Sequence, residues 1–173
     1  MKPINVVTAL SRLLTKPDLL DQFESHPGKI AALLNVAEEE RPCFVALSPQ
    51  QIRAQAKLLI TKRQREVYTL LPHTFNQLGT DVTAIFEKYA VDYWPNTHQR
   101  HLEDAIQFAR YLKSQPFPVS QDELNHLQFL SSGRRIRLAL VKNTRIKGKW
   151  LPALQLCYRS KGTINQWRFY LKG

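Results

Sequence analysis

The chain has 173 residues, 43% of them hydrophobic and 23% charged, with a formal net charge of +11. These proportions exclude a collagen, a disulfide-rich miniprotein and a wholly disordered chain, and no stretch approaches the roughly 20 apolar residues of a membrane-spanning helix. Cys43 and Cys157 are too few for a disulfide framework, and no secretory signal pattern is present. We therefore expect a cytoplasmic protein with reduced thiols and no membrane association.

Residues 4–123 show the hydrophobic spacing of consecutive helices. The clearest helix start is at Ser48, which is a predicted N-cap, with Pro49 at the first helical position and Gln51 completing a capping box. This helix is predicted to run to Leu71. The other predicted helices lie around residues 6–14, 17–25, 30–34, 75–78, 82–89, 98–112 and 124–130.

Three later positions carry the residue types that begin or end helices. Gly79 is a good residue to follow a helix, because a helix commonly ends on a left-handed glycine. Thr97 is a predicted N-cap. Ser120 and Glu123 have the spacing of a second capping box, which would open the last helix.

From Gly133 onwards the hydrophobic period changes from that of a helix to that of a strand. Apolar side chains alternate with others over residues 136–140, 150–158 and 164–171, and two turns separate these segments. Pro152 donates no backbone hydrogen bond, so we expect it at the start of its strand or at a bulge. The pattern predicts a three-stranded antiparallel meander.

The predicted fold class is therefore α+β, with a multi-helix domain over residues 1–132 followed by a small three-stranded antiparallel sheet over residues 133–173. A sheet of this size is marginally stable alone, so one face must pack on something. Trp167 and Phe169 share a face with Leu171, and we expect this aromatic face to be the one that packs on the helices.

The positive charge is confined to the end of the chain. Residues 1–123 hold equal numbers of acidic and basic residues, whereas residues 124–173 hold 11 Lys and Arg and no Asp or Glu. Such a segment attracts acidic partners. Three uses stay open: a stacking platform for nucleic acid, charges that merely protect the sheet edges, or capture of an acidic peptide as an added strand. The candidate peptide-binding residues are Arg135, Arg137, Lys142, Arg145, Arg168 and Tyr170.

No catalytic, cofactor-binding or metal-binding residue is predicted. The chain has no Gly-rich phosphate loop and no nucleophile motif. His98 and His101, near Glu103, are either ligands of a metal ion or solvated side chains of a helical first turn, and the second reading is favoured. The basic residues within 62–66 are either a contact for an acidic partner or a solvated helix face, and again the second is favoured.

The order of elements over residues 55–115 resembles a known group of proteins. The resemblance rests on the segments Tyr68-Thr69-Leu70-Leu71-Pro72-His73-Thr74-Phe75, Phe86-Glu87-Lys88-Tyr89, Tyr93-Trp94-Pro95 and Asp104-Ala105-Ile106-Gln107-Phe108-Ala109-Arg110-Tyr111-Leu112. These segments resemble the small helical proteins that accompany iron-dependent TIM-barrel enzymes modifying ribosomally made peptides. The added basic sheet is similar to the methanobactin-biosynthesis branch of that group.

The resemblance implies a non-catalytic accessory subunit without a cofactor of its own, while the partner TIM-barrel enzyme holds the iron. In that reading the helices dock on the barrel, and the sheet helps to bind the leader of a precursor peptide whose cysteines become oxazolone and thioamide groups. The alternatives are a nucleic-acid-binding regulator that uses the basic sheet, which the absence of a basic recognition helix makes unlikely, and an independent enzyme built around His98, His101 and Glu103.

Overall fold

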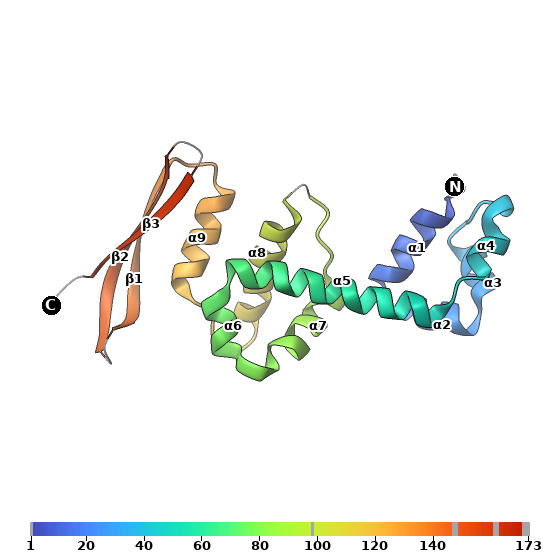
Figure 1. Ribbon diagram of the computed structural model, residues 1–173, viewed down its shortest axis with the longest axis horizontal. Helices are drawn as coiled ribbons and strands as arrows, with labels where there is room; N and C mark the ends of the chain where they lie inside the picture. The colour runs from blue at the N-terminus through green and yellow to red at the C-terminus, as the bar shows by residue number, and fades with distance from the viewer. Residues whose placement is uncertain (1, 98, 147–148, 161–162, 171–173) are drawn as a thin grey trace. The chain divides into compact units, whose positions relative to one another are not determined.

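The computed structural model describes residues 2–97, 99–146, 149–160 and 163–170, and over 142–146 and 149–151 it describes the backbone alone. The predicted fold class is confirmed, because a series of helices is followed by a three-stranded antiparallel sheet (Figure 1). The chain divides into two compact units. One consists of Met1–Arg65 and Ala84–Trp94, and the other of Glu66–Thr83 and Pro95–Gly173. The sheet therefore belongs to the same unit as the helices within residues 66–83 and 95–132.

The first unit is built from short helices around a hydrophobic core of aliphatic residues and two phenylalanines. It contains α1 (Val6–Thr15), α2 (Pro17–Ser25), α3 (Pro27–Leu33), the 3-10 turn η1 (Glu38–Glu40), α4 (Arg41–Val45) and parts of α5 (Pro49–Leu70) and α7 (Val82–Asp92). Phe23 and Phe44 are fully buried and meet edge to face, with ring centroids 5.0 Å apart. Asn5 is the N-cap of α1, since its side-chain oxygen accepts a hydrogen bond from the backbone amide of Thr8 at 2.9 Å.

The interpretation of residues 62–66 as a solvated helix face is wrong for Arg63. This side chain is buried within the first unit, and its Nη2 donates to the Tyr93 carbonyl oxygen at 2.9 Å. Its guanidinium also lies over the ring of Trp94, 4.6 Å from the centroid. Aromatic rings attract a cation through their negative faces, so the Arg63 side chain organises the end of α7 rather than a surface.

The second unit combines helices with the sheet. Its helices are the end of α5, α6 (Pro72–Leu78), the 3-10 turn η2 (Gly79–Asp81), α8 (Arg100–Ser114) and α9 (Gln121–Ser131). Pro72 interrupts α5 as predicted and begins α6. Gly79 has a φ of 62°, which confirms its place after a helix. No helix within the described ranges is long and apolar enough to cross a membrane.

The predicted cap at Thr97 is wrong, and the capping box predicted for Ser120 and Glu123 is right only in the position of Ser120. Gln99 rather than Thr97 precedes α8. Ser120 does precede α9, but the Glu123 carboxylate turns to another helix: it accepts hydrogen bonds from the backbone of His73 at 2.6 Å and of Thr74 at 2.9 Å. These are unpaired donors at the start of α6, which attract a carboxylate more strongly than one local amide does.

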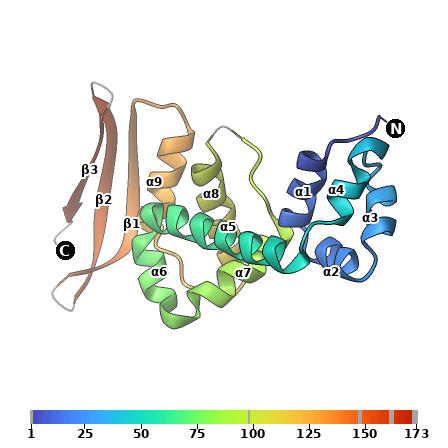
Figure 2. The same cartoon turned by 45° about the vertical axis from the view of Figure 1, so that its right-hand side comes forward.

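The sheet has the strand order β1 (Ile136–Ile146), β2 (Lys149–Ser160) and β3 (Thr163–Tyr170), with both pairs antiparallel. β1 extends through residues predicted as a turn, because the pairing resumes after a register shift between Val141 and Thr144. Pro152 lies opposite this irregularity, between the paired residues Leu151 and Ala153, which confirms the prediction that it lies at a bulge. α9 runs beside the sheet, nearest to β1 (Figure 2).

Candidate functional site

The pairing register sorts the side chains of the sheet onto two faces, because side chains alternate along a strand. The inner face, towards α9, consists of Arg137, Ala139, Val141, Ala153, Gln155, Cys157, Arg159, Ile164, Gln166, Arg168 and Tyr170. The outer face, away from α9, consists of Ile136, Leu138, Leu140, Leu154, Leu156, Tyr158, Asn165, Trp167 and Phe169.

The inner face is joined to α9 by buried amides. Gln155 is fully buried; its Nε2 donates to the Asp122 carbonyl oxygen at 3.0 Å, and its Oε1 accepts from Asn125 Nδ2 at 3.1 Å. Ala153 and Cys157 flank Gln155 on this face and are also buried. Their small side chains allow the helix to approach closely enough for these hydrogen bonds.

Two of the candidate peptide-binding residues take part in the same junction. Arg168 forms an ion pair with Asp122, with Nη1 and Oδ2 3.2 Å apart. Arg137 donates from Nη2 to Oε1 of Gln128, also on α9. Both arginines are half-buried on the inner face. Both side chains connect the sheet to α9, Arg168 through an ion pair and Arg137 through a hydrogen bond to a neutral amide.

Of the remaining candidates, the structure describes the side chains of Arg135 and Tyr170 only. Arg135 is exposed just before β1, and Tyr170 is half exposed at the end of β3. The backbones of Lys142 and Arg145 belong to β1, but their side chains lie outside the described residues.

Arg159 on the inner face is a residue that the sequence analysis missed. Its Nη2 donates to the carbonyl oxygens of Leu130 at 2.9 Å and Phe129 at 3.4 Å, and its guanidinium lies 5.3 Å from the centre of the Phe129 ring. Within the described part of the chain, no carboxylate lies within ion-pair distance of it. Among the described residues, its positive charge is met by the carbonyl groups at the end of α9 and by the Phe129 ring.

The outer face corrects the expectation about packing. The expected buried face, with Trp167 and Phe169, is the one away from the helices, and Leu171 lies outside the described residues. Leu138–Leu156–Trp167 and Leu140–Leu154–Phe169 form continuous apolar rows across the three strands. The expectation failed because buried amides and small side chains, rather than the largest apolar ones, meet α9.

The outer face is both apolar and accessible. Ile136, Leu138, Leu140, Trp167 and Phe169 are between 47% and 62% exposed. The rings of Trp167 and Phe169 stack, with centroids 6.4 Å apart and planes at 19°. None of the nine outer-face residues is charged. An exposed apolar surface that crosses three strands is typical of an interaction site.

The sheet is open at both sides, since β1 and β3 are its edge strands. Within the described ranges, no backbone hydrogen bond from outside the sheet reaches the outer edge of β3. Amide and carbonyl groups of such an edge are available to pair with another extended segment.

Two hollows lie on the inner side beneath β3. The larger, about 450 Å³, is lined by Leu70, His101, Leu102, Leu130, Arg159 and Ile164. The smaller, about 200 Å³, lies beside Gln166 and Arg168 and is lined by His73, Asp122, Glu123 and His126. β3 thus has open space along its inner face, whereas the inner side of β1 packs on α9.

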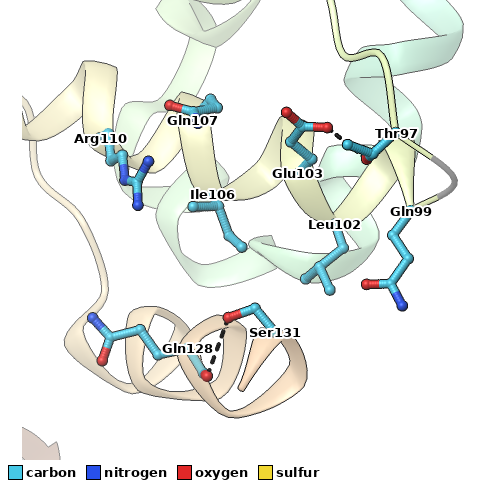
Figure 3. A pocket seen from close by; sticks show the side chains of 9 residues that line it. All are labelled: Thr97, Gln99, Leu102, Glu103, Ile106, Gln107, Arg110, Gln128 and Ser131. Atoms are coloured by element: carbon cyan, nitrogen blue, oxygen red, sulfur yellow. Dashed lines mark hydrogen bonds between the residues drawn. The ribbon is translucent and has the colours of Figure 1, made fainter. Parts of the chain in front are cut away.

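A third hollow, of about 600 Å³, lies between α8 and α9 (Figure 3). Leu102 and Ile106 of α8 point towards α9, and Gln128 and Ser131 form the opposite wall (Figure 3). Gln128 is also the residue that binds Arg137 of β1. The groove is therefore adjacent to the sheet, but no strand residue lines it.

Burial changes two pKa values in this unit. It lowers the pKa of His126, whose Nδ1 is buried without a hydrogen-bond partner, because the charged imidazolium is poorly solvated there. Burial also raises the pKa of the Cys157 thiol, because the charged thiolate is poorly solvated there. Cys157 is consequently a packing residue on the inner face, while Cys43 is exposed on α4.

The predicted polar cluster near the start of α8 is only partly described. His98 lies outside the described residues, His101 is exposed, and Glu103 accepts a hydrogen bond from the Thr97 hydroxyl at 2.6 Å. Throughout the portion that the structure covers, no group of three or more His, Cys, Asp and Glu residues is arranged to hold a metal ion.

Comparison with known proteins adds one finding. The family model described as "SCO6045-like, C-terminal domain" matches residues 31–114, from within α3 to the end of α8. The proteins of that family are uncharacterised, and the match does not include α9 or the sheet. No curated protein and no solved structure matches the chain. The chain is similar in its helical part to this family, and its sheet stands outside the similarity.

Proposed function

We propose that this chain is a non-catalytic, peptide-binding subunit of a cytoplasmic peptide-modifying complex. The sheet takes up an extended segment of the substrate peptide at its edge, and the helices dock on the enzyme that carries out the chemistry. The single observation that carries the proposal is a sheet whose β3 edge is paired with no other described segment. This sheet lies in a segment with 11 basic and no acidic residues, and its outer face is apolar and exposed.

The sequence resemblance supplies the identity of the partner in this proposal. The chain looks like MbnC, the methanobactin-biosynthesis subunit, and the family match over residues 31–114 is compatible with that. The partner is then an MbnB-like TIM-barrel enzyme that holds the iron, and the substrate is the leader of an MbnA-like precursor peptide. In that partner, bound iron would supply the chemistry that oxidises the cysteines of the peptide. The present chain would bind the leader of the peptide.

The physical benefit of such a division is local concentration. A peptide held at the sheet keeps its reactive segment near the partner's site, so the second encounter becomes intramolecular. Strand addition suits this task because the backbone provides affinity at any sequence, and side-chain contacts on alternate positions provide selectivity.

Co-expression tests the assignment of the partner. The chain is expected to co-purify with an iron-loaded MbnB-like barrel enzyme, and omission of the chain is expected to reduce turnover of the precursor peptide at least about tenfold. An enzyme that modifies the peptide at the same rate without this chain would contradict an accessory role.

Backbone methylation tests strand addition directly. Two versions of one acidic peptide, N-methylated at odd or at even positions, keep identical side chains but lose opposite sets of N–H donors. One version is expected to bind as the unmodified peptide does and the other to lose binding, because only one set faces β3. Equal effects of both versions would exclude pairing at an edge.

A second candidate function, binding of single-stranded nucleic acid, is favoured by the stacked and exposed Trp167 and Phe169 rings. Against it, none of the nine described outer-face residues is a cation that could meet phosphates, and Arg137 and Arg168 contact α9 on the inner face. Nucleic-acid binding would weaken steeply with salt. The affinity of an apolar peptide segment for the same rings would change little with salt concentration.

A further inference from the structure

The two sides of β3 differ in chemistry, and this difference specifies what the edge accepts. A segment added beside β3 continues the alternation of the sheet, so successive side chains point to the outer and the inner face. Its outward side chains lie next to Asn165, Trp167 and Phe169. Its inward side chains lie next to Ile164, Gln166 and Arg168.

On the outer side, the neighbours at Trp167 and Phe169 are apolar, whereas Asn165 is polar. Trp167 and Phe169 are each about half exposed, and behind them Leu156 and Leu154 complete the two rows. A polar or charged side chain placed beside Trp167 or Phe169 would lose water without gaining a polar partner, because the rows that contain these two rings are apolar. Bulky apolar side chains would cover the exposed rings and rows.

On the inner side, the position beside Ile164 adjoins a hollow that a cation of the neighbouring strand β2 also lines. Arg159 pairs with Ile164 in register, and both line the hollow of about 450 Å³. Within the structure's described part, the guanidinium of Arg159 has carbonyl partners but no carboxylate. Residues 124–173 contain no acidic side chain that would compete for it. The hollow has room for an incoming Asp or Glu.

The other inward position has a different environment. The smaller hollow beside Arg168 already contains Asp122, which is paired with Arg168, and Glu123, which caps α6. A further carboxylate there would be repelled, whereas a neutral polar side chain would not. The inner side therefore favours an acidic residue at the Ile164 end and a neutral one at the Arg168 end.

We infer that the segment captured at the β3 edge alternates bulky apolar residues, facing Trp167 and Phe169, with polar residues that include an acidic one facing Arg159. The inference rests on the proposed function and adds the substrate class to it. It assigns the contact surface to Trp167, Phe169 and Arg159, none of which is among the basic candidates predicted from the sequence.

Two synthetic peptides of equal composition test the pattern on the wild-type full-length chain. In the first, leucine alternates with glutamate or glutamine over eight residues, the length of β3. In the second, the same residues are grouped into an apolar block and a polar block. Fluorescence anisotropy of labelled peptide is expected to give a Kd at least about tenfold lower for the alternating peptide. Replacing its glutamates by glutamine is expected to weaken binding by a similar factor.

A matched pair of variants locates the contact. Trp167→Ser is expected to raise the Kd of the alternating peptide about tenfold, whereas Leu138→Ser, equally exposed on the same face but in β1, is expected to change it less than about twofold.

The outcomes separate the inference from the function beneath it. Equal binding of both peptides overturns the inference and leaves peptide capture standing. Binding of neither overturns both. If an oligothymidylate binds more tightly than the alternating peptide, and Trp167→Ser abolishes that binding, the inference is overturned. The rings are then assigned to nucleic acid.

Discussion

Glu123 acts far from its position in the sequence. Its carboxylate accepts hydrogen bonds from the backbone amides of His73 and Thr74 and from the Thr74 hydroxyl, the last at 2.6 Å. The Thr74 hydroxyl in turn accepts from the Ser120 amide at 3.0 Å. One buried acid thus fixes the start of α6 against the start of α9.

Glu123→Gln is expected to lower the free energy of unfolding by about 2–3 kcal/mol, because the new amide nitrogen is a donor that faces other donors in a buried place. Urea unfolding measures the change. The exposed Glu39 on η1 offers the control, and Glu39→Gln is expected to change the free energy by less than about 0.5 kcal/mol. Equal effects of the two substitutions would contradict the capping role.

His126 is expected to make the fold sensitive to mild acid. Its pKa in the folded state is lowered by burial from the ordinary value of 6.5. As the pH falls below about 6.5, the unfolded chain binds a proton that the folded chain does not, so stability decreases until the pH reaches the folded-state pKa. Above about 6.5 both states are neutral and the effect vanishes.

The comparison of wild type with His126→Gln checks this direction. Urea unfolding at a series of pH values is expected to show a smaller loss of stability in the variant as the pH falls from 7 towards 5, since one destabilising protonation is removed. His73 lies in the same hollow and provides a matched variant, His73→Gln. An unchanged pH profile in His126→Gln would show that this imidazole is solvated.

At the scale of elements, α9 and the sheet form one structural unit. Gln155 on β2 binds Asp122 and Asn125, and Gln121 in turn donates to Asn125 at 3.2 Å. These amides replace the apolar contacts expected between a sheet and a helix. The orientation of α9 on the sheet therefore depends on hydrogen bonds, which are directional, more than on burial of large side chains.

Gln155→Ala is expected to destabilise the chain by about 2–3 kcal/mol, because it leaves the Asn125 amide buried without its partner and opens a cavity. Gln166→Ala, the same substitution at an exposed position of the same face, is expected to cost less than about 0.5 kcal/mol. Thermal unfolding followed by circular dichroism measures both. Similar midpoints would mean that the amide network contributes nothing.

At the scale of the whole molecule, the exposed apolar outer face is a candidate binding site and also a surface through which copies of the chain can associate. The double variant Leu138→Ser, Trp167→Ser is expected to bind less of a hydrophobic dye and to associate less at high salt, with the free energy of unfolding changed by less than about 1 kcal/mol. Val7→Ser, on a single exposed apolar residue of α1, is the control and is expected to leave dye binding unchanged. Undiminished dye binding by the double variant would place the accessible apolar surface elsewhere.

The order and type of the elements follow from local patterns. Asn5, Pro49 and Gly79 act through backbone groups within a few residues of themselves, so the helices that they begin or end are predictable from one sequence. Pro152 belongs to the same class, because a missing donor restricts a strand whatever surrounds it.

The placement of the sheet's faces was not predictable in this way. Alternation assigns Trp167 and Phe169 to one face, but it does not say which face meets α9, and the size of the aromatic rings favoured the wrong answer. That choice depends on Gln155, Asn125 and Asp122, which are distant in sequence and meet only in the folded chain. Arg159, the cation we assign to the acidic residue of a bound segment, was hidden for the same reason: its role depends on the end of α9, about 29 residues earlier in the chain.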